Sequence, residues 1–249
     1  MTEHSFDVIV VGAGPMGSAA ARHLAEMGVK TALVGPSEPD VKADHTGVFA
    51  SHYDQARITR KIDTRKNWAR LSQEAIKRYP EIASKGEQSF YSPAGAIIAG
   101  TEVGEGREFV LNAQRNALAN NVPHLPLRGS DLAARFPEFS FPDGILALYE
   151  DHDAGWINPR LHVKAEITAA TKAGAVLYRD TALRIDDAKG AAQVHCAGGS
   201  VLTADKVIVA CGAFSKAEGL LPDPIPMRVY ARTIAFFELD EAEAARLAK

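Results

Sequence analysis

The sequence has few cysteines, no excess of positive charge and no long hydrophobic run. Its 249 residues contain only two cysteines, Cys196 and Cys211, which argues against a disulfide scaffold, and neither has the spacing of a zinc ligand. With 28 lysines and arginines against 31 aspartates and glutamates, the net charge of -3 provides no positive field to attract nucleic acid or an anionic membrane. The chain begins without a basic region, and its apolar run 8–11 is too short for a signal or a membrane span. We therefore expect a cytoplasmic protein that binds no nucleic acid, membrane or metal.

Length and composition indicate an ordinary globular protein. The sequence is 46% hydrophobic and 24% charged, which excludes a disordered or fibrous chain. A length of 249 residues allows one large domain or two interleaved domains, each with room for a core.

The first 34 residues have the pattern of a βαβ unit. The β-branched run 8–11 predicts a strand buried on both faces of a parallel sheet, and residues 31–34 predict the next strand. A helical pattern lies between them and ends at Gly28. Its expected buried face consists of Met16, Ala20, Leu24 and Met27.

A glycine-rich segment, Gly12-Ala13-Gly14-Pro15-Met16-Gly17, joins the first strand to this helix. In a dinucleotide-binding loop the first glycine permits a tight turn, the second admits a pyrophosphate and the third lets helix and strand pack closely. The helix N-terminus then supplies N–H groups to the anion. The position between a strand and a helix favours a bound dinucleotide over a ligand-free turn.

The acid that usually follows the second strand, where it binds the adenosine ribose, is absent. Gly35 stands at that point in Leu33-Val34-Gly35-Pro36-Ser37-Glu38. Either Ser37 or Glu38 reaches the ribose from the loop, or backbone and water do so. A glycine also suits the 2′-phosphate of NADP, but no arginine lies nearby to receive it.

The middle of the chain alternates polar loops with short periodic segments. Residues 44–60 are polar and rich in His, Tyr and Arg, which makes them a candidate site. A helix ending at Pro80 is expected to bury Trp68, Leu71, Ala75, Ile76 and Tyr79. Further helices are expected at 109–119, at 130–136 with Ser130 as its cap, and from Asn158 to Gly174. Residues 181–203 are expected to form short strands that turn at Lys189-Gly190 and Gly198-Gly199.

Three segments together resemble the FAD-dependent D-amino-acid oxidase superfamily, and within it the sarcosine oxidase-like branch. They are the βαβ opening, residues 51–60 and the run 204–214. The resemblance implies an α/β fold in which a GR2-type, Rossmann-like FAD-binding domain carries an inserted mixed-sheet substrate domain. The FAD-binding domain would consist of residues 1–84 and 153–215, and the substrate domain of residues 85–152 and 216–249.

The resemblance also implies the site residues. Arg57 would lie toward the flavin and Arg60 would bind the substrate carboxylate; the alternative is that each forms a surface ion pair, with Asp54 or Asp63. The implied FAD-binding residues are Gly12, Gly14, Pro15, Met16, Gly17, Ser51, Arg57, Ala182, Gly212 and Ala213. Ala182 would contact the adenine end, and Gly212 and Ala213 would lie beside the flavin. His52 is either a site residue or a structural one.

The implied function is oxidation of a secondary or N-alkylated amino acid. The flavin would accept a hydride, the imine would be hydrolysed, and O2 would reoxidise the flavin to give H2O2. Members of the family continue beyond residue 249, so the alternatives are a fragment, a non-catalytic FAD-binding subunit, or a chain completed by a second polypeptide. An NAD(P)H-dependent flavin monooxygenase is disfavoured because no second G-x-G-x-x-G follows a strand.

Overall fold

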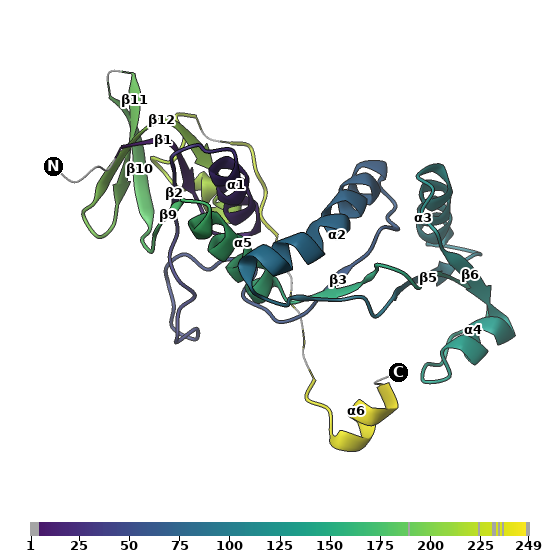
Figure 1. Cartoon of the computed structure of the whole chain (residues 1–249). Helices are drawn as coiled ribbons and strands as arrows, with labels where there is room; N and C mark the ends of the chain where they lie inside the picture. The colour runs from purple at the N-terminus through teal and green to yellow at the C-terminus, as the bar shows by residue number, and fades with distance from the viewer. Residues whose placement is uncertain are drawn as a thin grey trace. The chain divides into compact units, whose positions relative to one another are not determined.

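The computed structural model describes residues 5–188, 190–223, 225–230, 233, 235 and 237–247. Lys189, which was expected in a turn, lies outside the described residues. The chain forms two compact units (Figure 1). The first unit contains Met1–Arg57, Arg78–Tyr91 and Ile157–Val229, and the second contains Ile58–Lys77, Ser92–Trp156 and Tyr230–Lys249. Their assignment to flavin and substrate stays a prediction.

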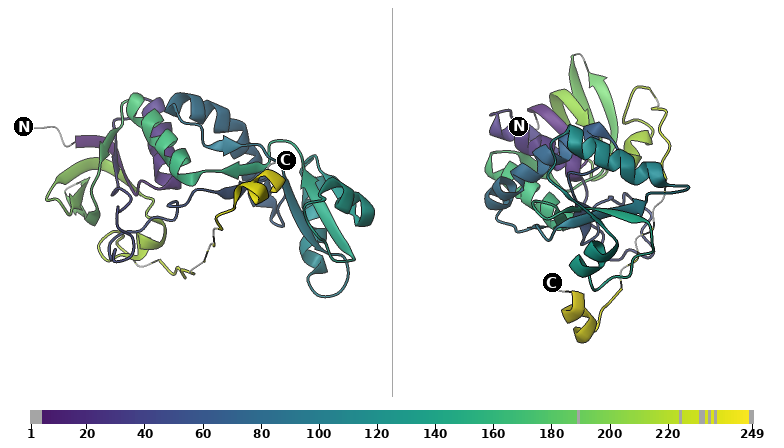
Figure 2. Two further views of the ribbon diagram at one scale, coloured as in Figure 1. Left: turned by 90° about the horizontal axis from the view of Figure 1, so that it is seen from below. Right: turned by 90° about the vertical axis from the view of Figure 1, so that its right-hand side faces the viewer.

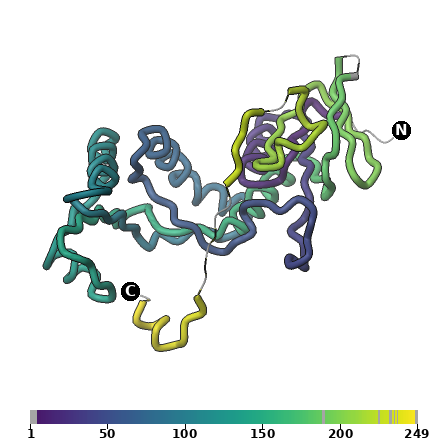
Figure 3. The backbone as a smooth tube through the Cα atoms, turned by 180° about the vertical axis from the view of Figure 1, so that it is seen from behind, coloured from purple at the N-terminus to yellow at the C-terminus, as the bar shows by residue number. Residues whose placement is uncertain are grey.

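The first unit is built on a six-stranded mixed sheet with the order β10-β11-β12-β1-β2-β9. β1 (Ser5–Val11) runs parallel to β2 (Thr31–Val34) and to β12 (Val201–Val209), and β2 runs parallel to β9 (Val176–Tyr178). β10 (Ala182–Ala188) and β11 (Ala191–Cys196) extend the sheet in antiparallel fashion. Figure 3 shows the late strand β12 beside the N-terminal strand β1. The predicted βαβ unit is therefore present, with β1 inside the sheet.

Both faces of β1 are buried, as its β-branched sequence predicts. Val8 and Val10 pack on one face with residues of α1 (Pro15–Glu26) and α5 (Pro159–Lys172). Ile9 and Val11 pack on the other face, where Val194 is among their neighbours. This alternation follows the two-residue repeat of a strand. Figure 2 shows α5 beside α1.

The expected face of α1 is buried only in part: Ala20 and Leu24 are half-buried and pack against the core, but the two methionines do not. Met16 and Met27 are 78% and 76% exposed. The buried residues of α1 are Gly17, Ser18, Ala21, Arg22 and Ala25. Small side chains allow a helix to approach a strand and a second helix closely, so packing distance outweighs hydrophobicity on this face.

The helix α2 (Lys66–Gly86) passes from the second unit into the first. Ile76 and Tyr79 are buried as expected, but Trp68 and Leu71 are 56% and 54% exposed and Ala75 is also exposed. The helix contains Pro80 and continues to Gly86, so the predicted end at Pro80 is wrong. The chain also passes from one unit to the other within three short strands. These are β3 (Arg57–Thr59), β4 (Tyr91–Ser92) and β8 (Gly155–Ile157).

The second unit has a three-stranded antiparallel sheet with the order β5-β7-β6. Its strands are β5 (Ala96–Thr101), β6 (Leu125–Arg128) and β7 (Ile145–Glu150). α3 (Arg107–Ala119) contributes Val110 to a core with Leu146 and Leu148, and α4 (Gly129–Arg135) packs Leu132 against Ala147. A short helix, α6 (Glu241–Leu247), follows.

Two predicted helix caps have different outcomes. Asn158 caps α5, and its side chain accepts a hydrogen bond from the Leu161 N–H at 3.1 Å. Ser130 is not a cap, because α4 begins one residue earlier, at Gly129. Within the described residues, no helix is both long and apolar enough to cross a bilayer, and no cluster of three His, Cys, Asp or Glu side chains could hold a metal.

Candidate functional site

The glycine-rich loop lies at the carboxyl ends of the parallel strands in the first unit. The Gly12 N–H donates to the Val34 carbonyl at 2.7 Å, and the Ala210 N–H donates to the Val11 carbonyl at 2.7 Å. The ends of β1, β2 and β12 are thereby tied together. In open α/β sheets, ligands bind at this edge.

Gly12 and Gly17 are required by the fold itself. Gly12 has φ +111°, and a Cβ at this residue would lie 2.4 Å from the Ala210 carbonyl oxygen. A Cβ at Gly17 would lie 1.7 Å from the Gly12 carbonyl oxygen. Side chains at these two positions would separate α1 from the strands.

Gly14 has no such structural reason to be glycine. Its φ of -83° suits any residue, and among the described residues, apart from the two chain neighbours, a Cβ placed there has one atom within 4 Å, His52 Nδ1 at 3.8 Å. The protein alone therefore leaves room for a side chain at this position. The space beside the Gly14 backbone is open to a group from outside the protein, and the assignment of Gly14 to the cofactor stays a prediction.

The N-terminus of α1 is suited to an anion. Gly14 is its N-cap and has no side chain to accept from the first N–H groups, and Pro15 follows at the start of the helix. The first turn contains no acidic residue. Its N–H groups and the positive end of the helix dipole therefore remain available to a phosphate.

The other residues expected at the cofactor fall into two places. Met16 is exposed at the start of α1, and Gly212 and Ala213 begin a 3-10 helix (Gly212–Lys216) just after β12. Cys211 connects these to the glycine loop, since its Sγ donates to the Val11 carbonyl at 3.3 Å. Ala182 begins the sheet-edge strand β10, where it pairs with Cys196, and β11 and β12 separate it from β1. These assignments stay predictions.

Each predicted arginine has a carboxylate partner within its own unit. Arg57 Nε donates to Asp54 Oδ2 at 2.8 Å, and its guanidinium also donates to the Ser51 carbonyl. In the second unit, Arg60 donates to Asp63 Oδ2 at 3.1 Å, while its Nε is buried without a hydrogen-bond partner among the described residues. The ion pairs named as the alternative are thus formed, and the roles toward flavin and substrate stay predictions.

An ion pair that was not predicted from the sequence, between Arg160 and Glu38, holds the loop after β2. Arg160, in the first turn of α5, donates from Nε to Glu38 Oε2 at 2.7 Å and from its terminal nitrogen to Glu38 Oε1 at 2.8 Å. The guanidinium of Arg160, helped by Lys42, lowers the pKa of Glu38 to about 2. Arg160 also donates to the Tyr53 carbonyl. A cation at a helix N-terminus is unfavourable by itself, which is the one signal in the sequence that Arg160 needs a carboxylate.

The structure gives a packing reason for the glycine that stands where an acid usually binds the ribose. A Cβ at Gly35 would lie 2.5 Å from the Ala13 Cβ, so close packing against the glycine loop requires glycine there. Glu38, one of the two side chains expected to reach the ribose, forms an ion pair with Arg160, and its role toward the ribose stays a prediction.

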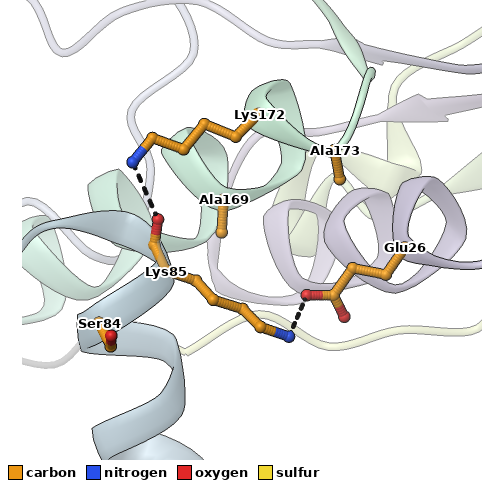
Figure 4. Close-up of a pocket in the computed structure, with 6 residues that line it drawn as sticks. All are labelled: Glu26, Ser84, Lys85, Ala169, Lys172 and Ala173. Carbon is orange, nitrogen blue, oxygen red and sulfur yellow. Dashed lines mark hydrogen bonds and ion pairs between the residues drawn. The ribbon is translucent and has the colours of Figure 1, made fainter.

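A separate pocket of about 420 Å³ in the first unit lies away from these residues (Figure 4). It is lined by Glu26, Ser84, Lys85, Ala169, Lys172 and Ala173. Its charged groups are already engaged, because Lys85 Nζ binds Glu26 Oε1 at 2.8 Å and Lys172 Nζ donates to the Lys85 carbonyl at 3.3 Å. None of the predicted site residues lines it.

A parallel-centred sheet with a glycine-rich loop at a helix N-terminus defines a dinucleotide-binding protein. The chain belongs to the FAD dependent oxidoreductase (DAO) family, whose sequence pattern matches residues 7–248. This confirms the resemblance, and FAD is the cofactor of the family. The three fold features above, an open Gly14, an uncapped helix N-terminus and a first turn without acids, fit the diphosphate of FAD.

Similar proteins include two curated oxidases. The chain is 31% identical over 246 residues to monomeric sarcosine oxidase from Bacillus sp. (strain B-0618), covering 98% of this chain and 60% of that protein. It is 26% identical over 243 residues to N-methyl-L-tryptophan oxidase from Yersinia pestis (strain Pestoides F), covering 94% and 60%. The chain thus spans about 60% of the length of these relatives.

Solved structures support the same fold. NikD, described as an unusual amino acid oxidase essential for nikkomycin biosynthesis, matches with a TM-score of 0.65 and 26% identity over 86% of this chain and 53% of that one. Glycine oxidase from Geobacillus kaustophilus matches with a TM-score of 0.67 and 17% identity over 83% and 55%, a likeness of fold. The predicted α/β FAD-binding fold class is confirmed.

Proposed function

We propose that the protein is an FAD-dependent oxidase of a secondary or N-alkylated amino acid. The observation that carries the cofactor assignment is Gly14, since its neighbours among the described residues leave room for a side chain there. The names of the two curated relatives, sarcosine oxidase and N-methyl-L-tryptophan oxidase, support an N-methyl amino acid as substrate. The partners in this proposal are that small amine and O2, with H2O2 as product, and the place of action is the cytoplasm.

In this proposal the first unit binds the cofactor and the second unit binds the substrate. The first unit binds FAD through the glycine loop, the N-terminus of α1 and the residues after β12. The bound flavin supplies the hydride acceptor for the C–H bond beside the amine nitrogen. The second unit carries Arg60 and binds the substrate, so that the chain's own contribution to the reaction is to hold and orient its two ligands.

Arg60 is suited to bind a carboxylate. Among the described residues, the guanidinium of Arg60 donates to Asp63, and its buried Nε has no hydrogen-bond partner. A planar guanidinium can grip a carboxylate with two parallel hydrogen bonds while Asp63 fixes its orientation. Removing one partner of a shielded charge pair costs roughly 2–5 kcal/mol.

The activity can be tested on the purified protein loaded with FAD. Anaerobic addition of sarcosine or N-methyl-L-tryptophan should bleach the flavin absorbance, and admission of air should restore it and release H2O2. Bleaching by NADPH in place of the amines would identify a monooxygenase. A flavin that none of these compounds reduces would identify a non-catalytic FAD-binding protein.

Variants test Arg60 separately. Arg60→Ala should lower kcat/KM on the order of thirty-fold or more, because each 1.4 kcal/mol corresponds to a factor of ten. Arg60→Lys should restore only part of the activity, since an ammonium cannot form the two-bond fork. Arg115→Ala is the matched control: Arg115 is an exposed arginine of the same unit that pairs with Glu108 at 3.2 Å. Unchanged oxidation by Arg60→Ala would remove Arg60 from the substrate site.

A further inference from the structure

The segment Ser51–Tyr53 faces the glycine loop and is held from both sides by arginines. The Ser51 carbonyl accepts from Arg57, and the Tyr53 carbonyl accepts from Arg160. Arg160 is itself held by a two-bond pair with Glu38, and Arg57 pairs with Asp54, so each carbonyl is bound to an arginine that a carboxylate orients. The residue between the two carbonyls, His52, therefore lies on a backbone that is hydrogen-bonded on both sides.

His52 has an unsatisfied nitrogen beside Gly14. The side chain is only 8% exposed, and Nδ1 is buried without a hydrogen-bond partner among the described residues. The same atom lies 3.8 Å from the position that a Cβ on Gly14 would take. Native proteins rarely leave a buried polar atom unpaired, because the lost hydrogen bond to water is not replaced.

The charge state of the ring suits a single hydrogen bond. Burial lowers the pKa of His52 to about 4, so the imidazole is neutral near pH 7. The charged groups that face it are two carboxylates, Glu38 and Asp54, and two guanidinium groups, Arg57 and Arg160. A neutral imidazole donates from one ring nitrogen only.

We propose that His52 is a cofactor-binding residue whose Nδ1–H donates to a diphosphate oxygen of FAD at the N-terminus of α1. Two independent features meet at one place in the first unit: the unpaired nitrogen of His52, and the glycine at position 14, which leaves both open space and an uncapped helix. The glycine provides the space, the helix provides backbone donors and His52 provides a side-chain donor. The inference rests on the FAD cofactor of the family and not on the proposed substrate.

Two substitutions distinguish the ring nitrogens. The side-chain amide of asparagine can place an N–H where Nδ1 lies, whereas the longer side chain of glutamine places it where Nε2 lies. His52→Asn should therefore keep FAD affinity within about threefold of the wild type, and His52→Gln and His52→Phe should raise the Kd tenfold to a hundredfold. The Kd is measured by the quenching of flavin fluorescence on titration of the apoprotein.

Fragments of the cofactor locate the contact. His52→Gln should weaken binding of ADP by the same factor as FAD and leave binding of adenosine unchanged, because only ADP carries a diphosphate. His195→Gln is the matched control, since His195 lies in the same unit but pairs with Asp186 at 3.0 Å. Thermal unfolding of each apoprotein shows whether the variant is folded.

Each outcome decides the question. Equal losses in His52→Asn and His52→Gln, or losses shared by adenosine, would mean that His52 only packs the loop and would overturn the proposal, as would full FAD affinity in His52→Gln. The predicted pattern of Kd values together with an absence of amine oxidation would leave the His52 contact standing and refute the proposed function.

Discussion

The three glycines of the loop should respond differently to the same substitution, alanine. Gly14→Ala should leave the fold intact and weaken FAD binding, whereas Gly12→Ala and Gly17→Ala should disrupt the fold. The reason is geometric: a Cβ at Gly14 meets no atom closer than 3.8 Å, but at Gly12 and Gly17 it would lie 2.4 and 1.7 Å from carbonyl oxygens.

The magnitudes follow from these distances. At Gly14, alanine reduces the entropy of the unfolded chain, which stabilises by about 0.4–1 kcal/mol, and is a poorer N-cap by a similar amount, so the net change should stay within about 1 kcal/mol. At Gly12, a positive φ costs about 1–3 kcal/mol and overpacking about 1–3 kcal/mol more. For a chain of this size each 1 kcal/mol lowers Tm by about 2–4 °C, so a total cost of about 2–6 kcal/mol should lower the Tm of Gly12→Ala by roughly 4–24 °C.

Two measurements on each apoprotein separate the effects. Thermal unfolding followed by circular dichroism reports the fold, and titration with FAD reports the cofactor site. Gly14→Ala should keep the wild-type Tm within about 4 °C and raise the Kd for FAD at least tenfold, equivalent to about 1.4 kcal/mol. Unchanged FAD affinity in Gly14→Ala would refute the reasoning that assigns this glycine to the cofactor.

Three further predictions concern charged groups. The folded-state pKa of Glu38 is about 2, below its unfolded value, so its pair with Arg160 should stabilise the protein fully above about pH 4.5 and lose that effect as the pH falls toward 2. Glu38→Gln should therefore lower the free energy of unfolding, measured in urea, by about 1–2 kcal/mol at pH 6 and by much less at pH 3. Arg22→Ala should cost about 3–5 kcal/mol, since it leaves the carboxylate of Glu166 buried without its guanidinium, and Arg22→Leu combined with Glu166→Leu should recover most of that loss in the same assay. Glu150→Ala should cost about 2–4 kcal/mol, because the backbone N–H groups of residues 61 and 62 lose their buried acceptor; an unfolding free energy equal to the wild type would show that these N–H groups find another partner.

The parts of the fold that the sequence predicted are those set by local chemistry. The β-branched run before Gly12 specifies a strand that is buried on both faces, and the cap at Asn158 specifies where α5 begins. Both depend on residues within one helical turn or a few strand positions of each other. Such patterns do not require knowledge of what packs against them.

The errors concern features that depend on tertiary approach. Four of the five buried residues of α1 are small because the helix lies close to α5 and the sheet, so the apolar periodicity was right for Ala20 and Leu24, which pack against the core, and wrong for the two exposed methionines. Arg22 is buried there because Glu166, on α5, supplies a carboxylate 144 positions away. The spacing of residues along the sequence does not predict this contact between Arg22 and Glu166.

The loop between β2 and β3 has features that depend on local sequence and others that depend on tertiary contacts. Its polar composition predicted a site, which stays a prediction, whereas its arrangement depends on Arg160, which lies 122 positions from Glu38 in the chain. Arg57 illustrates the consequence: it was assigned to the flavin, yet its hydrogen bonds hold the carbonyl of Ser51 and the carboxylate of Asp54. An arginine engaged in this way can influence the cofactor by fixing the backbone that carries His52. The ion pair between Arg57 and Asp54 is therefore compatible with a role of Arg57 at the cofactor site. Arg57 would act there indirectly, because it holds the Ser51 carbonyl next to His52.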